Sequence, residues 1–169
     1  QLKQRDISFR CRIIGEGKER TTLERMISEM GLSDSIQLLG AKTEDEVAQL
    51  LPTAHCYVQP SIVTPSGKME GVPVSIMEAF ACGLPVIASQ LSGIAEIVRP
   101  DETGYLVPPA NADALADVLE IVQKEPASAM NLAEQGRLLV LKEFDLTDNV
   151  SKLIRLFRQY LEPTTEIVK

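Results

Sequence analysis

Two glutamates eight residues apart, Glu70 and Glu78, are the side chains of this sequence best placed to do chemistry. Glu70 lies in an irregular stretch, residues 59–73, and such stretches inside a compact domain are usually binding loops, although a solvated charge is an equal candidate. Glu78 follows in residues 72–82, where Ser75 is the only other polar side chain, so the pattern predicts a helix buried on all sides. A buried carboxylate needs a partner, either a structural amide or basic side chain, or the hydroxyls of a ligand such as a ribose.

Gly71, Val72 and Pro73 come where that helix is expected to begin. Proline suits the first turn of a helix, where its missing N–H costs nothing. The free N–H groups around Gly71 and Val72 would then point off the amino end of the helix, which carries partial positive charge. Gly71 has no side chain to block approach, so these residues predict a backbone cradle for an anion.

A second glycine-rich loop runs from Gly15 to Arg20 after the first expected strand. A dinucleotide fingerprint needs a third glycine where Arg20 stands, and a P-loop needs Gly-Lys followed by Ser or Thr after a longer loop. Neither motif fits. The loop is therefore either a tight strand-to-helix turn or a place where a flat ligand such as a base approaches the backbone, with Lys18 near a phosphate.

These loops need a scaffold, and short apolar runs that alternate with helix-period segments supply one. Strands are predicted over residues 9–14, 36–39, 56–58, 85–88 and 105–107. Helices are predicted before Gly31, from the capping box of Thr43 and Glu46 to Pro52, and over residues 72–81, 111–123, 127–143 and 147–161.

The alternation predicts an α/β fold, with a doubly wound, Rossmann-like parallel sheet flanked by helices. Ligands of such sheets sit beyond the carboxyl ends of the strands, where both loops lie. Residues 1–169 are expected to form one domain, in which residues 146–169 are a C-terminal helix and tail. The apolar stripe of that helix is expected to pack on the core, or to be partly a surface that another domain covers.

Composition excludes several functions. Of the 169 residues 44% are hydrophobic, enough to bury a core, and a net charge of −7 without clustered Lys or Arg argues against nucleic acid as a partner. Cys11, Cys56 and Cys82 are widely spaced and odd in number, which predicts free thiols in a cytoplasmic protein. No apolar run reaches the length of a membrane helix.

Metal ligands and hydroxyl nucleophiles find little support. His55 is the single histidine and has no Cys or Asp cluster nearby in the sequence, so no metal site is predicted. Ser61, Thr64 and Ser66 have no identifiable base, and they are expected to hydrogen-bond the loop backbone or a phosphate.

The stretch of residues 70–89 resembles the E-x7-E region of family-4 retaining glycosyltransferases, especially those that build bacterial exopolysaccharides. Further matches are Ile-Ile-Gly-Glu-Gly at 13–17, Leu-Leu-Gly at 38–40, Pro-Ser at 60–61, Gly93, Glu-Ile-Val at 96–98 and residues 101–107. Together the matches extend over residues 8–160, so the spaced set is far more specific than any one of them.

The resemblance implies a GT-B enzyme, in which two Rossmann-like domains face each other and the carboxyl-terminal one, represented here, binds the nucleotide-sugar donor. Glu70 would be the catalytic residue, in contact with the donor sugar near the reacting centre. Glu78 would hold the ribose hydroxyls. The other donor-binding residues would be Gly71, Val72 and Pro73, which present backbone to the sugar and diphosphate, and Gly15 and Gly40, which line the base pocket.

Such enzymes transfer a hexose from a nucleoside diphosphate to an acceptor hydroxyl with retention of configuration, and without a metal or other cofactor. The resemblance implies a sugar or lipid-linked sugar as acceptor, bound by an amino-terminal domain, in polysaccharide or glycolipid synthesis. It places the parent enzyme in the cytoplasm, at the inner face of the cell membrane.

The sequence departs from the family before Ser8. The family carries there a strand followed by an Arg and a Lys that neutralise the diphosphate, whereas seven residues precede Ser8 here. The sheet is therefore expected to lack its first strand, and the isolated chain to be inactive. Two alternatives are a non-catalytic interaction domain that kept the fold, and an enzyme that uses another phosphorylated ligand on the same cradle.

Overall fold

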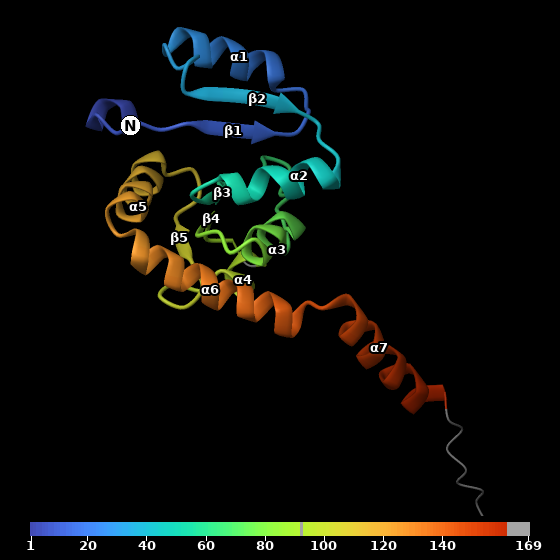
Figure 1. Cartoon of the computed structure of the whole chain (residues 1–169). Helices are drawn as coiled ribbons and strands as arrows, with labels where there is room; N and C mark the ends of the chain where they lie inside the picture. Colours follow the sequence, from blue (N-terminus) through green and yellow to red (C-terminus); the bar gives the residue numbers. More distant parts are fainter. Residues whose placement is uncertain (92, 162–169) are drawn as a thin grey trace, which may run out of the picture.

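The computed structural model describes residues 1–91 and 93–161, with the side chain of Leu161 left aside. Its strands and helices alternate along the chain (Figure 1). They are β1 (Cys11–Ile14), α1 (Arg20–Glu29), β2 (Ile36–Gly40), α2 (Glu44–Leu50), β3 (Tyr57–Gln59), α3 (Val74–Ala81), β4 (Val86–Ser89), α4 (Ile94–Ile97), β5 (Tyr105–Val107), α5 (Ala112–Lys124), α6 (Pro126–Glu143) and α7 (Leu146–Leu161), with short 3-10 helices η1 (Leu2–Arg5) and η2 (Leu51–Thr53).

All strand pairs are parallel, which confirms the predicted α/β class, but the strands form two groups instead of one sheet. One group has the order β1-β2 and the other β3-β4-β5. The doubly wound order 3-2-1-4-5-6 places its first strand in the centre. The two groups correspond to strands 3-2 and 4-5-6 of that order, so the interruption falls where the expected first strand would lie.

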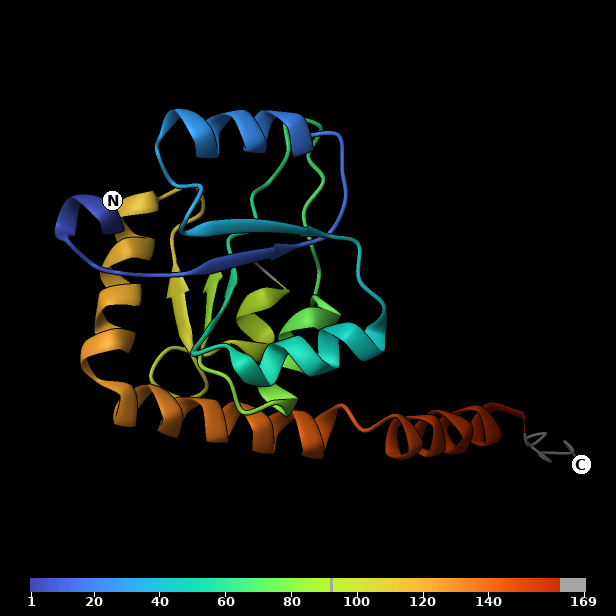
Figure 2. The ribbon, with the colours of Figure 1, turned by 45° about the horizontal axis from the view of Figure 1, so that its top comes forward.

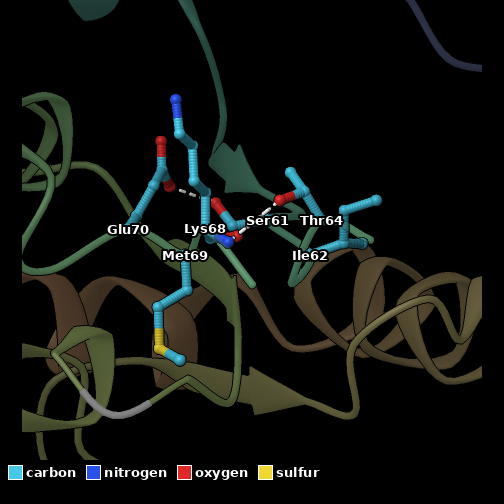
Figure 3. A pocket seen from close by; sticks show the side chains of 6 residues that line it. All are labelled: Ser61, Ile62, Thr64, Lys68, Met69 and Glu70. Atoms are coloured by element: carbon cyan, nitrogen blue, oxygen red, sulfur yellow. Dashed lines mark hydrogen bonds between the residues drawn. The ribbon is translucent and has the colours of Figure 1, made fainter. Parts of the chain in front are cut away.

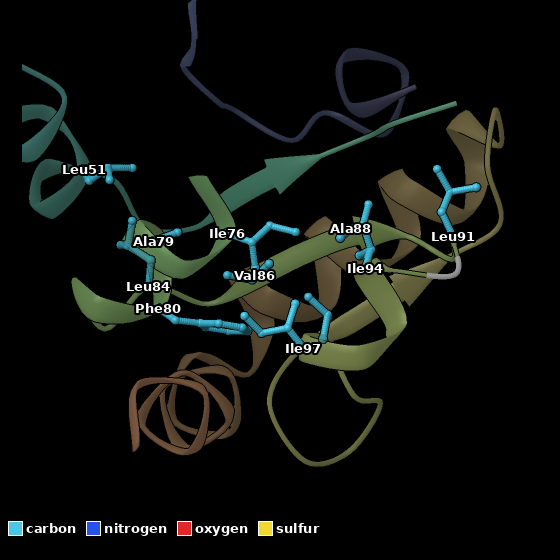
Figure 4. Close-up of a cluster of buried hydrophobic side chains, with 11 residues drawn as sticks. Leu51, Ile76, Ala79, Phe80, Leu84, Val86, Ala88, Leu91, Ile94 and Ile97 are labelled. Carbon is cyan, nitrogen blue, oxygen red and sulfur yellow. The ribbon is translucent and has the colours of Figure 1, made fainter. Parts of the chain in front are cut away.

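Helices cover both faces of the β3-β4-β5 group, and every residue of β4 is buried. Because side chains alternate along a strand, Val86 and Ala88 face the cluster built with α3 and α4, whereas Ile87 faces the cluster under α5. Figure 4 shows the first cluster around β4. Phe80 is fully buried there, and Gly136 of α6 makes room for it, since a Cβ at Gly136 would lie 2.3 Å from the Phe80 ring.

Local signals place several ends of helices correctly. Thr43 and Glu46 form the predicted capping box at the start of α2. The backbone N–H of Thr43, together with the ammonium group of Lys42, lowers the pKa of Glu46 to about 2. After α1, Gly31 adopts φ +62°, a conformation that ends helices.

Helix α3 corrects two predictions. It begins at Val74 and has Pro73 as its N-cap, because the extended ψ of 129° at Pro73 lies outside the helical range. It is also buried on one side only, through Ile76, Ala79 and Phe80, whereas Val74 is 65% exposed and Glu78 is exposed. The composition of α3 suggested burial all round, but in the described part of the chain the elements that mainly pack against α3, namely α6, β3 and β4, leave Val74 and Glu78 exposed.

Helix α7 corrects a third prediction. It extends away from the rest of the molecule in both views (Figures 1 and 2). The apolar side chains of its stripe that the structure describes are exposed, and they include Leu146, Val150, Leu153, Ile154 and Phe157. The stripe therefore does not pack on the core. The predicted tail at 162–169 lies outside the described residues. Among those that are described, no helix is both long enough and apolar enough to cross a membrane.

Candidate functional site

The long loop after β3 closes on itself at its tip. Thr64 donates its backbone N–H to the carbonyl of Lys68 (2.8 Å), and its Oγ1 accepts the N–H of Lys68 (3.0 Å). Gly67, at φ +77°, donates its N–H to the carbonyl of Thr64 (2.9 Å). The hydroxyls of Thr64 and Ser66 lie 3.0 Å apart. The Thr64 hydroxyl thus hydrogen-bonds the loop backbone, as predicted, whereas the Ser66 hydroxyl pairs with that of Thr64.

The same loop carries Glu70, and two neighbours hold its carboxylate. Ser61 donates its hydroxyl to Oε2 of Glu70, and the amide nitrogen Nε2 of Gln59 donates to that oxygen as well (2.9 Å). Nε2 also donates to Oγ of Ser61 (3.0 Å). Glu70 is therefore a held side chain at the carboxyl end of β3, and not simply a solvated charge.

A surface hollow of about 280 Å³ lies beside this carboxylate (Figure 3). It is lined by Ser61, Ile62, Thr64, Lys68, Met69 and Glu70. In Figure 3 the side chains of Lys68 and Glu70 point to the same side of the loop. The hollow thus offers a carboxylate that can accept hydrogen bonds from hydroxyls and an ammonium group that can pair with an anion.

The backbone of Gly71 packs against Gly93, just before α4. A Cβ at Gly93 would lie 2.3 Å from the carbonyl carbon of Gly71 and 2.4 Å from its oxygen. Only a glycine at position 93 permits this approach. The contact holds the backbone of Gly71 in place just before α3, where the sequence predicts the anion cradle.

The amino end of α3 presents backbone N–H groups. Pro73 accepts the first helical bond, from the N–H of Ile76 to its carbonyl (3.1 Å), and the N–H groups of Val74 and Ser75 belong to the first turn, which has no intrahelical acceptor for them. The free N–H donors of the helix are thus those of Val74 and Ser75, three positions after the Gly71 and Val72 that the sequence suggested. Glu78, exposed one turn farther on, is on the outer side shared with Val74.

The other predicted residues, Gly15 and Gly40, meet at the carboxyl ends of β1 and β2. The N–H of Gly15 donates to the carbonyl of Gly40 (2.9 Å), and Gly40 has φ +73°. A Cβ at Gly40 would lie 2.9 Å from the Glu16 carboxylate, which Arg20 holds at 2.6 Å. Arg20, which breaks the dinucleotide motif, thus orients Glu16 over Gly40. The predicted residues therefore form two groups, one around Glu70 to Glu78 and one at these glycines.

The structure also places the cysteines and the other residue types that bind metals. All three cysteines are free thiols. Burial raises the pKa of Cys56, and the nearby Cys11 raises it further; burial also raises the pKa of Cys11. In the part of the chain that the structure describes, no three His, Cys, Asp or Glu side chains gather as metal ligands.

Three further residues matter to the site, and sequence patterns assign them no role: Tyr57, Gln59 and Gly93. Gln59 was visible as the start of the loop, and Gly93 as one match of the resemblance. Tyr57 looked like an ordinary strand residue. Burial raises the pKa of Tyr57, and the charges of Glu70 and Glu78 add to the effect.

A parallel α/β sheet with an acid-bearing loop and glycine turns at the carboxyl ends of its strands is typical of Rossmann-like domains that bind nucleotide ligands. The family described as glycosyl transferases group 1 matches residues 1–139, and the chain belongs to this family. The resemblance seen in the sequence is thereby confirmed.

Two curated relatives concern bacterial polysaccharides. The amylovoran biosynthesis glycosyltransferase AmsK of Erwinia amylovora is 36% identical over 144 residues, which are 85% of this chain and 35% of AmsK. The putative colanic acid biosynthesis glycosyltransferase WcaL of Escherichia coli K12 is 41% identical over 119 residues, 70% of this chain and 29% of WcaL. The chain thus spans about a third of the length of these relatives.

A solved structure supports the fold. Anabaena Alr3699/HepE, crystallised in complex with UDP-glucose, superimposes with a TM-score of 0.78 at 20% identity, over 89% of this chain and 41% of HepE. The Rossmann-like architecture of a GT-B glycosyltransferase domain is therefore confirmed for this chain.

Proposed function

We propose that this chain is the donor-binding half of a retaining glycosyltransferase, which transfers a hexose from a nucleoside diphosphate to an acceptor hydroxyl. The observation that carries the proposal is the carboxylate of Glu70, which Gln59 and Ser61 hold by hydrogen bonds. The next residue is Gly71, whose backbone packs closely against Gly93. The names of AmsK and WcaL support polysaccharide synthesis as the process, and glycolipid synthesis uses the same chemistry.

Each predicted residue has a role in the proposed complex. Glu70 contacts the donor sugar beside the reacting bond, and Glu78 accepts hydrogen bonds from the ribose hydroxyls. Gly71, Val72 and Pro73 bring backbone close to the sugar and diphosphate. Gly15 and Gly40 line the base pocket, where glycines leave room for a flat ring.

Charge on the departing diphosphate is met in this proposal by dipoles and cations and not by a metal. The amino end of α3 supplies oriented N–H groups, and Lys68 supplies an ammonium group on the rim of the hollow. Donor binding is accordingly expected to be unchanged by EDTA. A loss of binding that Mg²⁺ or Mn²⁺ restores would contradict metal independence.

The acceptor, a sugar or a lipid-linked sugar, is proposed to bind to a second domain that faces this one. AmsK and WcaL are about three times as long as the stretch matched here, which leaves room for such a domain in proteins of this kind. The isolated chain is therefore proposed to bind donor without transfer. Free thiols support the cytoplasm as its compartment, and the inner face of the membrane is the proposed location of the parent enzyme.

Calorimetry with UDP, GDP and ADP tests the donor site. One of them should bind at millimolar concentration or below, and Glu78→Gln should weaken it about tenfold, as expected for a lost hydrogen bond to a charged group. Glu134→Gln, an exposed glutamate on α6, is the matched control and should change nothing. If no nucleotide binds, or if both variants behave alike, the donor-site assignment is wrong.

A non-catalytic interaction domain is the second candidate function, and the exposed apolar stripe of α7 favours it. Such a domain would bind a partner protein and would not bind nucleotides. Nucleotide binding that depends on Glu78 would decide against it. An enzyme that uses another phosphorylated ligand would instead bind phosphate esters that lack a nucleoside.

A further inference from the structure

We propose that Tyr57 and Gln59 form a relay that sets the direction of the Glu70 carboxylate, so that they act as positioning residues. This inference rests on the proposed function, since it gives the orientation of Glu70 a purpose. The relay links three hydrogen-bonded side chains that are separate in the sequence and continuous in space, Tyr57, Gln59 and Glu70.

The first link anchors the oxygen end of the Gln59 amide. The hydroxyl of Tyr57 donates to Oε1 of Gln59 at 2.5 Å. Burial raises the pKa of Tyr57, so its phenol keeps the proton that this bond requires. Ser75, in the first turn of α3, acts against this effect and lowers the pKa of Tyr57.

The second link follows from the first. Because Tyr57 occupies Oε1, the two N–H bonds of the Gln59 amide are directed to Ser61 (3.0 Å) and Glu70 (2.9 Å). The opposite orientation would place a carbonyl oxygen against the carboxylate, without a donor on either side. The Glu70 carboxylate, which can only accept, requires the NH₂ end of the amide, and the Tyr57 hydroxyl anchors the oxygen end, so the two bonds hold the amide in one orientation.

The relay anchors the loop residue Glu70 to side chains of the strand β3. Tyr57 and Gln59 are two residues apart on β3, hence on the same side of the strand, and they pair with Val86 and Ala88 of the fully buried β4. Glu70 is exposed on the loop. Side chains on strands hold a site more tightly than loop residues do by themselves.

Both hydrogen bonds to the carboxylate end on Oε2. The donor sugar is proposed to bind the other oxygen, Oε1, whose direction is then set by the relay. Loss of the relay should weaken recognition of the sugar far more than recognition of the nucleotide, because the relay acts through Gln59 on Glu70, which contacts the sugar in the proposed complex.

The test compares UDP-glucose with UDP in calorimetry on the 169-residue chain. Tyr57→Phe and Gln59→Leu are each expected to weaken UDP-glucose about tenfold and UDP less than twofold. Tyr105→Phe is the matched control, since burial also raises the pKa of Tyr105, which lies on β5, beyond β4 in the same group, and it should change neither affinity. Thermal unfolding of each variant establishes that it is folded; Tyr57→Phe removes one oxygen and keeps the ring.

A double variant separates positioning from a merely structural effect. In the Glu70→Gln background, Tyr57→Phe should cause no further loss of UDP-glucose binding, because the relay acts through Glu70; a structural effect would add to it. The side-chain NH₂ signals of Gln59 in NMR spectra should also shift in Tyr57→Phe and in Glu70→Gln, but not in Tyr105→Phe.

The outcomes are distinguishable. If UDP and UDP-glucose both fail to bind the unmodified chain and other nucleotides fail too, the proposed function falls, and the relay loses its role with it. If both ligands bind and the variants weaken them equally, or if the double variant is additive, the relay is overturned and the donor site stands.

Discussion

The two groups of strands differ sharply in how deeply they are buried. In the β3-β4-β5 group every residue of β4 is buried, and α3 buries three side chains. In the β1-β2 group no residue of β1, β2 or α1 is fully buried, and Ile13 and Ile14 are 38% and 37% exposed. One half of the proposed site stands on each group: Glu70 and Glu78 on the first, Gly15 and Gly40 on the second.

The difference shows what holds each half of the site in place. Apolar clusters on both faces of β4 support the acidic half. The contacts that join the glycine half to the rest of the molecule include polar ones. Arg5 pairs with Asp117 (2.7 Å) and Glu120 (3.0 Å) of α5, and Arg12 donates to the hydroxyl of Thr53 (2.8 Å). Exposed ion pairs contribute little, so the glycine half should be the less stable one.

The largest expected effect concerns Phe80. Phe80→Ala should lower the free energy of unfolding by about 3–5 kcal/mol, because it empties a fully buried site in the main core. Met26→Ala, on α1, removes a side chain that is 44% exposed, and it should cost less than about 1 kcal/mol. Urea denaturation measures both. Equal losses would show that the two groups of strands form one core.

Gly93→Ala comes next and affects the acidic half. The new Cβ would collide with the backbone of Gly71, so the free energy of unfolding should fall by about 1–3 kcal/mol, as in overpacked cores, and the NMR amide signals of Gly71 and Val72 should move. Gly17→Ala is the control from the glycine half, since a Cβ there would meet nothing within 4 Å. A stability loss in Gly17→Ala as large as in Gly93→Ala would refute this explanation.

Hydrogen exchange should show the same contrast in the unmodified chain. The amides of β4 should exchange at least about tenfold more slowly than those of β1, because elements with few buried apolar contacts open more easily. Mass spectrometry or NMR measures the rates at each amide. Uniform protection over β1 and β4 would mean that the two groups open as one cooperative unit.

The smallest effect is expected at α2, which connects the two groups along the chain. The hydrogen bonds that lower the pKa of Glu46 from its usual 4.5 to about 2 stabilise α2 fully above pH 4.5, and this support is lost as the pH falls through 2. NMR titration of the carboxyl group should show a midpoint near 2. Lys42→Ala should raise it only part of the way to 4.5, because the backbone donor at Thr43 remains. A midpoint of 4.5 in the unmodified chain would contradict the capping box.

Local patterns predicted a large part of the structure. The five strands, the capping box at Thr43 and the stop at Gly31 were evident because they depend on neighbouring residues only. The short helix α4 was missed, since four residues give no periodicity to detect. Glu78 was placed in a buried helix and is exposed, because its surroundings depend on which elements cover α3.

The sequence by itself determined the α/β class, the family and the candidate residues, because these reside in the order and spacing of residue types. Only the tertiary structure decided that the strands divide into two groups, that α7 leaves its apolar stripe uncovered, and that Gly93 meets Gly71. It also decided that Tyr57 and Gln59 hold Glu70. Contacts of this kind join residues far apart in the chain or on opposite sides of a loop, and no local propensity encodes them.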